Sequence, residues 1–132
     1  MPAKSTKPKN VVHERNPHVI VDFVFDRGQL SISISNIGTQ PAYGVKVEFS
    51  HKLMGVEGTV EVSALPLFSQ LEFLPGGKEI TTYLDSSTSY FRSKQPTTIT
   101  TQITYTDAAS EEHTNTIRHN LEIYRGIGYT NL

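Results

Sequence analysis

The sequence contains no cysteine and no tryptophan. The lack of cysteine excludes disulfide bonds, thiolate metal ligands and cysteine nucleophiles. The lack of tryptophan removes the side chain most used for stacking on sugars, which weighs against a carbohydrate-binding module. No apolar run approaches the ~20 residues that are needed to cross a bilayer. We therefore expect a domain that does not insert into membranes.

The chain also lacks a large excess of positive or negative charge, because its formal net charge is −1. Such a balance gives no general attraction to nucleic acid or anionic lipid. The basic residues are nevertheless concentrated near the start, where residues 1–17 contain Lys4, Lys7, Lys9 and Arg15. This segment also has three prolines, and it predicts a flexible tail. Nucleic-acid-binding arms are usually more densely basic, so no nucleic-acid partner is expected.

The first ten residues lack the apolar segment of a secretory signal. The sequence as given therefore predicts a cytoplasmic protein. This prediction fails if the chain is excised from a longer protein, and an extracytoplasmic location is then expected.

Alternating apolar and polar residues dominate the rest of the chain. In Leu30–Asn36 and Val45–Phe49 the large apolar residues fall on every second position, with Ser, Lys and Glu between them. A period of two places the apolar residues on one face of a strand, so these segments predict half-buried strands of an antiparallel sheet. The residues expected in the core are Ile32, Ile34, Val45, Val47, Leu121 and Ile123.

The alternation and its turn signals predict about seven strands and no amphipathic helix. The expected strands are Val19–Phe25, Gln29–Asn36, Tyr43–Ser50, Phe68–Leu74 with Leu71 and Phe73 inward, Glu79–Leu84, Thr97–Tyr105 and Glu112–Tyr124, with a short edge strand possible at Thr59–Val62. The serine-rich segment 85–95 predicts a loop. This pattern favours an all-β, immunoglobulin-like antiparallel β-sandwich over residues 18–125, followed by a C-terminal tail at 126–132.

Three motifs resemble a known family. They are Asn36-Ile37-Gly38, where Asn and Gly predict a turn between two strands, the turn Phe73-Leu74-Pro75-Gly76-Gly77, and Ile103-Thr104-Tyr105-Thr106-Asp107 before the last strand. In this order they resemble the CARDB-type domains, the cell adhesion related domains found in bacteria, over roughly residues 19–124. The resemblance implies an adhesion or interaction module, usually outside the cell, without catalytic residues.

Five histidines, His13, His18, His51, His113 and His119, raise the possibility of a metal site. His113 and His119 lie six residues apart, which is about 20 Å along a strand and too far for one ion. Asp107, Glu111 and Glu112 cluster near one turn without the spacing of a calcium loop. No serine lies in a nucleophile elbow. We therefore expect no metal, no cofactor and no catalytic residue.

The segment Ser89–Ser93 is the strongest candidate for partner binding. It brings Tyr90, Phe91 and Arg92 together, and tyrosine and arginine are common at the energetic centres of interfaces. In the other interpretation Phe91 plugs the end of the sandwich and only Arg92 is exposed.

We therefore predict a non-catalytic structural or interaction module that binds a protein partner through loops or a sheet edge. A carbohydrate-binding module is the alternative hypothesis. An enzyme of unknown type ranks third, because fold alone does not determine function.

Overall fold

The computed structural model describes residues 16–127, so most of the predicted N-terminal tail and residues 128–132 lie outside the described part. The strands are β1 (Val19–Asp26), β2 (Gln29–Asn36), β3 (Ala42–Phe49), β4 (Met54–Gly55), β5 (Val60–Glu61), β6 (Leu71–Leu74), β7 (Glu79–Ser86), β8 (Thr98–Thr106) and β9 (Glu112–Asn120). One short α-helix, α2 (Ser87–Arg92), and three 3₁₀ turns, η2 (Val62–Ala64), η3 (Pro66–Phe68) and η4 (Leu121–Tyr124), complete the described elements.

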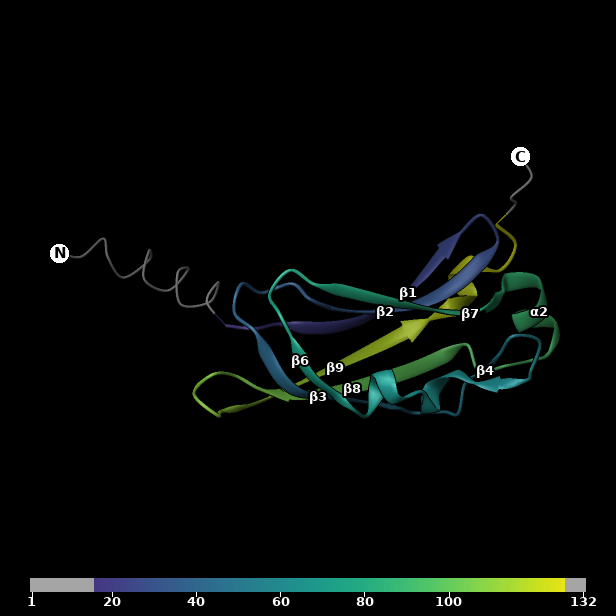
Figure 1. Ribbon diagram of the computed structural model, residues 1–132. Coiled ribbons are helices and arrows are strands. Elements are labelled where there is room, and N and C mark those ends of the chain that lie inside the picture. Colours follow the sequence, from purple (N-terminus) through teal and green to yellow (C-terminus); the bar gives the residue numbers. More distant parts are fainter. Residues whose placement is uncertain (1–15, 128–132) are drawn as a thin grey trace.

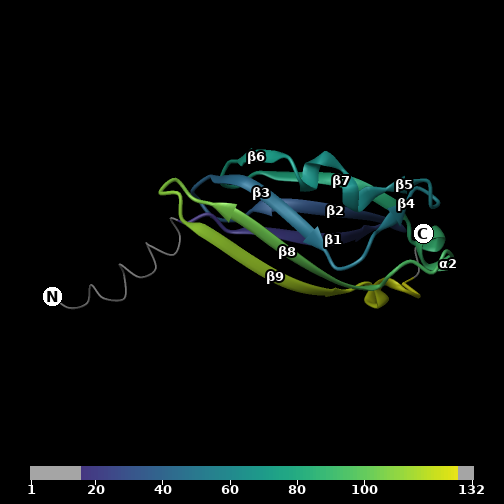
Figure 2. The same cartoon turned by 90° about the horizontal axis from the view of Figure 1, so that it is seen from below.

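Seven strands form two antiparallel sheets that face each other (Figures 1 and 2). One sheet has the order β1-β2-β7 and the other has the order β6-β3-β8-β9. β4 and β5, each two residues long, pair with each other as a separate hairpin. The predicted antiparallel β-sandwich is therefore confirmed. Among the described residues, no helix is long and apolar enough to cross a membrane.

The core lies between the two sheets and follows the predicted alternation. Ile32, Ile34, Val45, Val47 and Leu121 are buried, as predicted. The prediction for Ile123 is wrong, because its side chain is 63% exposed. The last strand ends at Asn120, whose side-chain oxygen accepts a hydrogen bond from the amide of Glu122 at 3.0 Å. This bond starts η4, and the change from strand to turn ends the two-residue period.

The prediction for the strand Phe68–Leu74 is partly wrong. Phe68 ends the 3₁₀ turn η3, which starts at Pro66, and the strand begins only at Leu71. Leu71 packs against the core, but Phe73 is 52% exposed. The neighbouring strand β3 is irregular at Gly44, whose φ is +59°, so Ala42 and Val45 are both buried although they are three residues apart. Leu74 and Leu71 pair with these two residues and therefore both face inward, so the simple alternation fails.

The segment 85–95, predicted to be a loop, contains the helix α2. The hydroxyl of Ser86 accepts a hydrogen bond from the amide of Ser89 at 3.1 Å, which is a typical N-terminal cap. The helix directs Tyr90 into the end of the core, where no part of this residue is exposed.

Side chains join the two sheets along the side where β1 lies beside β9. The amide of Asn115 donates to the carbonyl oxygen of Val19 at 2.8 Å, and the Tyr124 hydroxyl donates to that of Phe23 at 3.0 Å. The ring of His119 contacts Phe23 edge-on, with ring centroids 4.9 Å apart. The outer backbone edge of β1 is therefore partly satisfied by side chains, which protects it from pairing with other strands.

His119 makes this contact sensitive to pH. Burial lowers the pKa of His119 below its ordinary value of 6.5, and the charge of Asp22 only partly opposes this effect. Below about pH 6.5 the unfolded chain takes up a proton that the folded chain resists, so acid favours unfolding. We expect the free energy of unfolding of the native chain to fall more steeply between pH 7 and pH 5.5 than that of His119→Gln. Urea titrations at several pH values measure this difference. If the free energy of unfolding falls equally with pH in both proteins, His119 does not contribute to the pH dependence.

Candidate functional site

The structure separates the three residues predicted to bind a partner. Tyr90 is fully buried, and its hydroxyl donates to the carbonyl oxygen of Pro96 at 2.6 Å. Phe91 is half-buried beneath the guanidinium group of Arg125, which lies 4.4 Å from the ring centroid. Arg92 is exposed. Tyr90 rather than Phe91 plugs the core, so Tyr90 is removed from the predicted binding surface.

Hydroxyl groups contact imidazoles at two places, Thr101 with His119 at 3.1 Å and Ser50 with His51 at 2.9 Å. Thr101 has no exposed surface, so no substrate reaches its hydroxyl. Ser50 is exposed, and its hydroxyl also accepts from the amide of Thr100 at 2.9 Å, which ties it to the sheet. In the described part of the chain no three His, Asp or Glu residues are grouped so that they could hold a metal ion.

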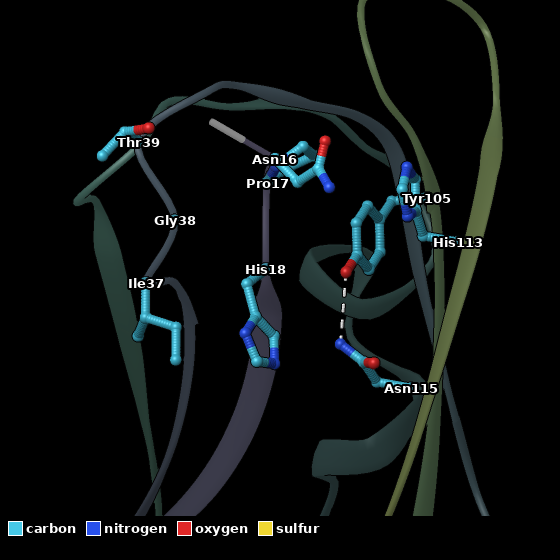
Figure 3. Close-up of a pocket in the computed structure, with 9 residues that line it drawn as sticks. All are labelled: Asn16, Pro17, His18, Ile37, Gly38, Thr39, Tyr105, His113 and Asn115. Carbon is cyan, nitrogen blue, oxygen red and sulfur yellow. Dashed lines mark hydrogen bonds between the residues drawn. The ribbon is translucent and has the colours of Figure 1, made fainter. Parts of the chain in front are cut away.

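A more promising site is a pocket (Figure 3) at the end of the sandwich opposite to α2 (Figure 1). We call it the end pocket. It has a volume of about 350 Å³ and is built from three segments that are far apart in the sequence. Its lining residues are Asn16, Pro17, His18, Ile37, Gly38, Thr39, Tyr105, His113 and Asn115.

Asn36 builds the first wall of the end pocket. Its side-chain oxygen accepts from the amides of His18 and Gly38, each at 3.0 Å. Its side-chain nitrogen donates to the carbonyl oxygens of Gln40 at 2.8 Å and Leu74 at 3.1 Å. This buried amide therefore ties the start of β1, the β2–β3 loop and the end of β6 together. The turn predicted at Asn36-Ile37-Gly38 is present.

Gly38 is needed for a close approach and not for a positive φ. A Cβ atom at this position would collide with the carbonyl oxygen of Asn16 and would lie 2.9 Å from the amide nitrogen of His18. The absence of a side chain therefore allows residues 16–18 to lie directly against the β2–β3 loop, which forms the back of the end pocket.

Tyr105 and His113 form the opposite wall, on the β8–β9 hairpin, and Asp107 contacts His113. The rings of Tyr105 and His113 are stacked, with centroids 5.3 Å apart and planes 9° apart. Asp107 holds His113 through a contact of 2.8 Å between Oδ2 and Nε2. The hydrogen bond from His113 lowers the pKa of Asp107, with further help from the amide of Glu111. The contact thus fixes the position of the His113 ring, and Asp107 carries a carboxylate at neutral pH.

The floor of the end pocket offers both a donor and an acceptor. The Tyr105 hydroxyl accepts from the amide of Val19 at 3.3 Å and from the side chain of Asn115 at 3.2 Å. Among the described residues no acceptor takes the proton of this hydroxyl, although Tyr105 is only 4% exposed. The side-chain oxygen of Asn115 likewise has no donor in the described part of the chain. A buried, unpaired polar group is costly, so the Tyr105 hydroxyl favours a polar ligand or water, and the half-buried Asn115 oxygen beside it is open to the same ligand.

Apolar and acidic groups surround this floor. Ile37 is 59% exposed at the rim, and Tyr43 and Phe73 form an exposed aromatic pair nearby, with centroids 5.5 Å apart. The hairpin beside the pocket carries Asp107, Glu111 and Glu112, while residues 105–117 contain no lysine or arginine. The end pocket therefore has an apolar rim on the side of the β2–β3 loop, and the β8–β9 hairpin beside it is acidic.

The family model of a domain of unknown function, DUF8453, matches residues 3–125. The chain belongs to this family. No curated protein and no solved structure matches the chain. The family match begins before the described residues, so the family pattern also includes the basic segment at 3–15.

Sequence reasoning identified the turn at Asn36 and Gly38 but missed the end pocket itself. The pocket forms only when residues 16–18, 37–39 and 105–115 meet in the fold. One local signal was available, because Ile37 is a large apolar residue inside a turn, where it has no strand face to bury it. Pro17, which was assigned to the tail, is buried and belongs to the pocket wall.

Proposed function

We propose that this domain is a non-catalytic interaction module that binds an extended, basic segment of a protein at the end pocket. The observation that carries the proposal is the pair of unsatisfied groups on the floor. The Tyr105 hydroxyl offers a donor and the Asn115 side-chain oxygen offers an acceptor. A peptide group carries one acceptor and one donor, so a single backbone unit of a partner complements both.

The rim supports a peptide over a purely polar ligand. Ile37 and Pro17 provide apolar surface on one side of the floor, and the stacked ring of Tyr105 provides it on the other. Binding pockets commonly combine apolar walls with a few fixed polar groups that orient the ligand. An apolar side chain next to the bound peptide unit would bury this surface.

The acidic hairpin supports a basic partner. Glu111 and Glu112 are exposed, and Asp107 is held in its ionised form. Charges at the rim of an interface steer the encounter and reject partners of like charge more than they add affinity. We infer that lysine or arginine residues flank the apolar anchor of the partner.

Two further observations favour binding over catalysis. The hydroxyl of Thr101 is buried beyond the reach of a substrate, and the imidazole of His113 is already engaged by Asp107. The resemblance to CARDB-type adhesion modules, which rests on the Asn36-Ile37-Gly38 and Pro75-Gly76-Gly77 turns, agrees with this proposal.

A selection from a displayed library of random linear peptides tests the proposal. We expect the full chain to enrich peptides that combine apolar and basic residues, and we expect Ile37→Glu to abolish their binding. Ile123→Glu is the matched control, because Ile123 is 63% exposed and lies at the other end of the molecule. Both changes affect exposed side chains, so both variants should unfold at nearly the same temperature as the native chain.

The outcome separates the proposal from its alternative. If the two isoleucine variants bind the peptides equally well, the end pocket is not the binding site. If no peptide is enriched and soluble oligosaccharides instead give a saturable response, the carbohydrate-binding hypothesis replaces the proposal.

A further inference from the structure

We propose that the partner of the end pocket is residues 3–15 of a second copy of this chain, exchanged reciprocally between two copies. This inference rests on the proposed function, because it names the segment that the same pocket binds. It also goes further, since it predicts that the protein associates with itself.

The segment has the chemistry that the end pocket requires. Residues 3–15 contain four basic residues, Lys4, Lys7, Lys9 and Arg15, and one acidic residue, Glu14. Their net charge of +3 is opposite in sign to that of the hairpin, which carries Asp107, Glu111 and Glu112. Val11 and Val12 lie between Lys9 and Arg15, so an apolar anchor with flanking cations is already present in the sequence.

The position of the segment favours exchange between two copies. Asn16, Pro17 and His18 line the end pocket, so the segment is joined to the domain at the end that carries the acceptor surface. When donor and acceptor lie at one end, reciprocal exchange closes a two-fold dimer and leaves no open site for a filament. Thirteen residues span at most about 45 Å when extended, which is ample to reach the same end of a neighbouring copy.

The same geometry disfavours binding to the pocket of the segment's own copy. Asn16 is itself part of the pocket wall, so Val12 would have to turn back within His13, Glu14 and Arg15. Only these three residues are available for the reversal. A second copy requires no such reversal.

The family match gives independent support. It covers residues 3–125 and therefore includes the basic segment together with the sandwich. A linker that binds nothing is not expected to be part of the sequence pattern that defines the family. A segment that binds the end pocket of another copy is expected to be part of it.

Sedimentation of the full chain over about a hundredfold range of concentration tests this inference through mass action. We expect a dimer whose dissociation constant rises at least about tenfold when Glu111→Lys and Glu112→Lys reverse the charge of the hairpin. Glu57→Lys with Glu61→Lys is the matched control, because both residues are exposed and lie on or beside the β4–β5 hairpin. Adding Lys7→Glu and Lys9→Glu to the hairpin variant should restore much of the dimer.

Two results would overturn the inference: a chain that remains monomeric at every concentration, or a dimer that responds equally to the hairpin and control variants. If the chain is monomeric and Lys7→Glu with Lys9→Glu shifts the amide resonances of the end pocket, the segment binds the pocket of its own copy. A monomer that still enriches peptides at the end pocket would retain the proposed function and reject only the self-association.

Discussion

Replacing Asn36 with alanine should lower the free energy of unfolding by about 3 to 5 kcal/mol. The side chain is fully buried, and it makes four hydrogen bonds to the backbone of His18, Gly38, Gln40 and Leu74. Alanine would leave two amides and two carbonyl groups without these partners, and each buried unsatisfied group costs about 1 to 3 kcal/mol before relaxation. Urea titrations of the native chain and the variant measure the difference.

Two further variants give this prediction its controls. Asn120→Ala also removes an asparagine, but its side chain is exposed and makes one bond to the amide of Glu122, so about 1 kcal/mol or less is expected. Asn36→Asp keeps the two acceptor bonds and places a carboxylate against the carbonyl oxygens of Gln40 and Leu74. That variant should regain stability relative to the native chain as the pH falls, because only the protonated acid can donate. Equal costs for Asn36→Ala and Asn120→Ala would show that Asn36 does not organise the end pocket.

Replacing Tyr90 with alanine should have an effect of similar size, about 3 to 5 kcal/mol, as for other large aromatic residues removed from a core. Tyr90 is among the largest fully buried side chains, and it closes the end of the core beneath α2. Its burial also raises the pKa of its hydroxyl, which stays protonated and donates to Pro96. Thermal and urea unfolding should both detect the loss.

The neighbouring residues provide the comparison. Tyr90→Phe removes only the hydroxyl and should cost about 1 to 2 kcal/mol through the lost bond to Pro96. Phe91→Ala should cost less than Tyr90→Ala, because Phe91 is only half-buried. A larger cost for Phe91→Ala would support the sequence-based interpretation, in which Phe91 is the plug.

The strands were predictable because the two-residue alternation is strong. The prediction for Gln29–Asn36 matches β2 in both of its ends. The alternation fails where a local hydrogen bond changes the backbone. Ser86 starts α2 and Asn120 starts η4, and each takes the chain out of the extended conformation within a few residues. Both residues are common helix caps, so the sequence contained a signal that the alternation outweighed.

The end pocket was less predictable, for a physical reason. Asn36 and Gly38 carry a local turn signal, and the turn was predicted from it. The contacts of Asn36 with His18 and Leu74 join residues 18 and 38 positions apart, and those of Tyr105 with Val19 span 86 positions. Such contacts depend on how the two sheets are stacked, and no local pattern of side chains encodes that stacking.

The most direct test of the central claim is an NMR titration of the full chain with a peptide enriched in the selection. If the end pocket is the binding site, the largest changes in amide chemical shift should fall in residues 16–18, 37–39 and 105–115. Ile37→Glu should abolish them, and Ile123→Glu should leave them intact. Shifts concentrated instead around α2 and residues 121–127, or shifts that persist in Ile37→Glu, would contradict the claim.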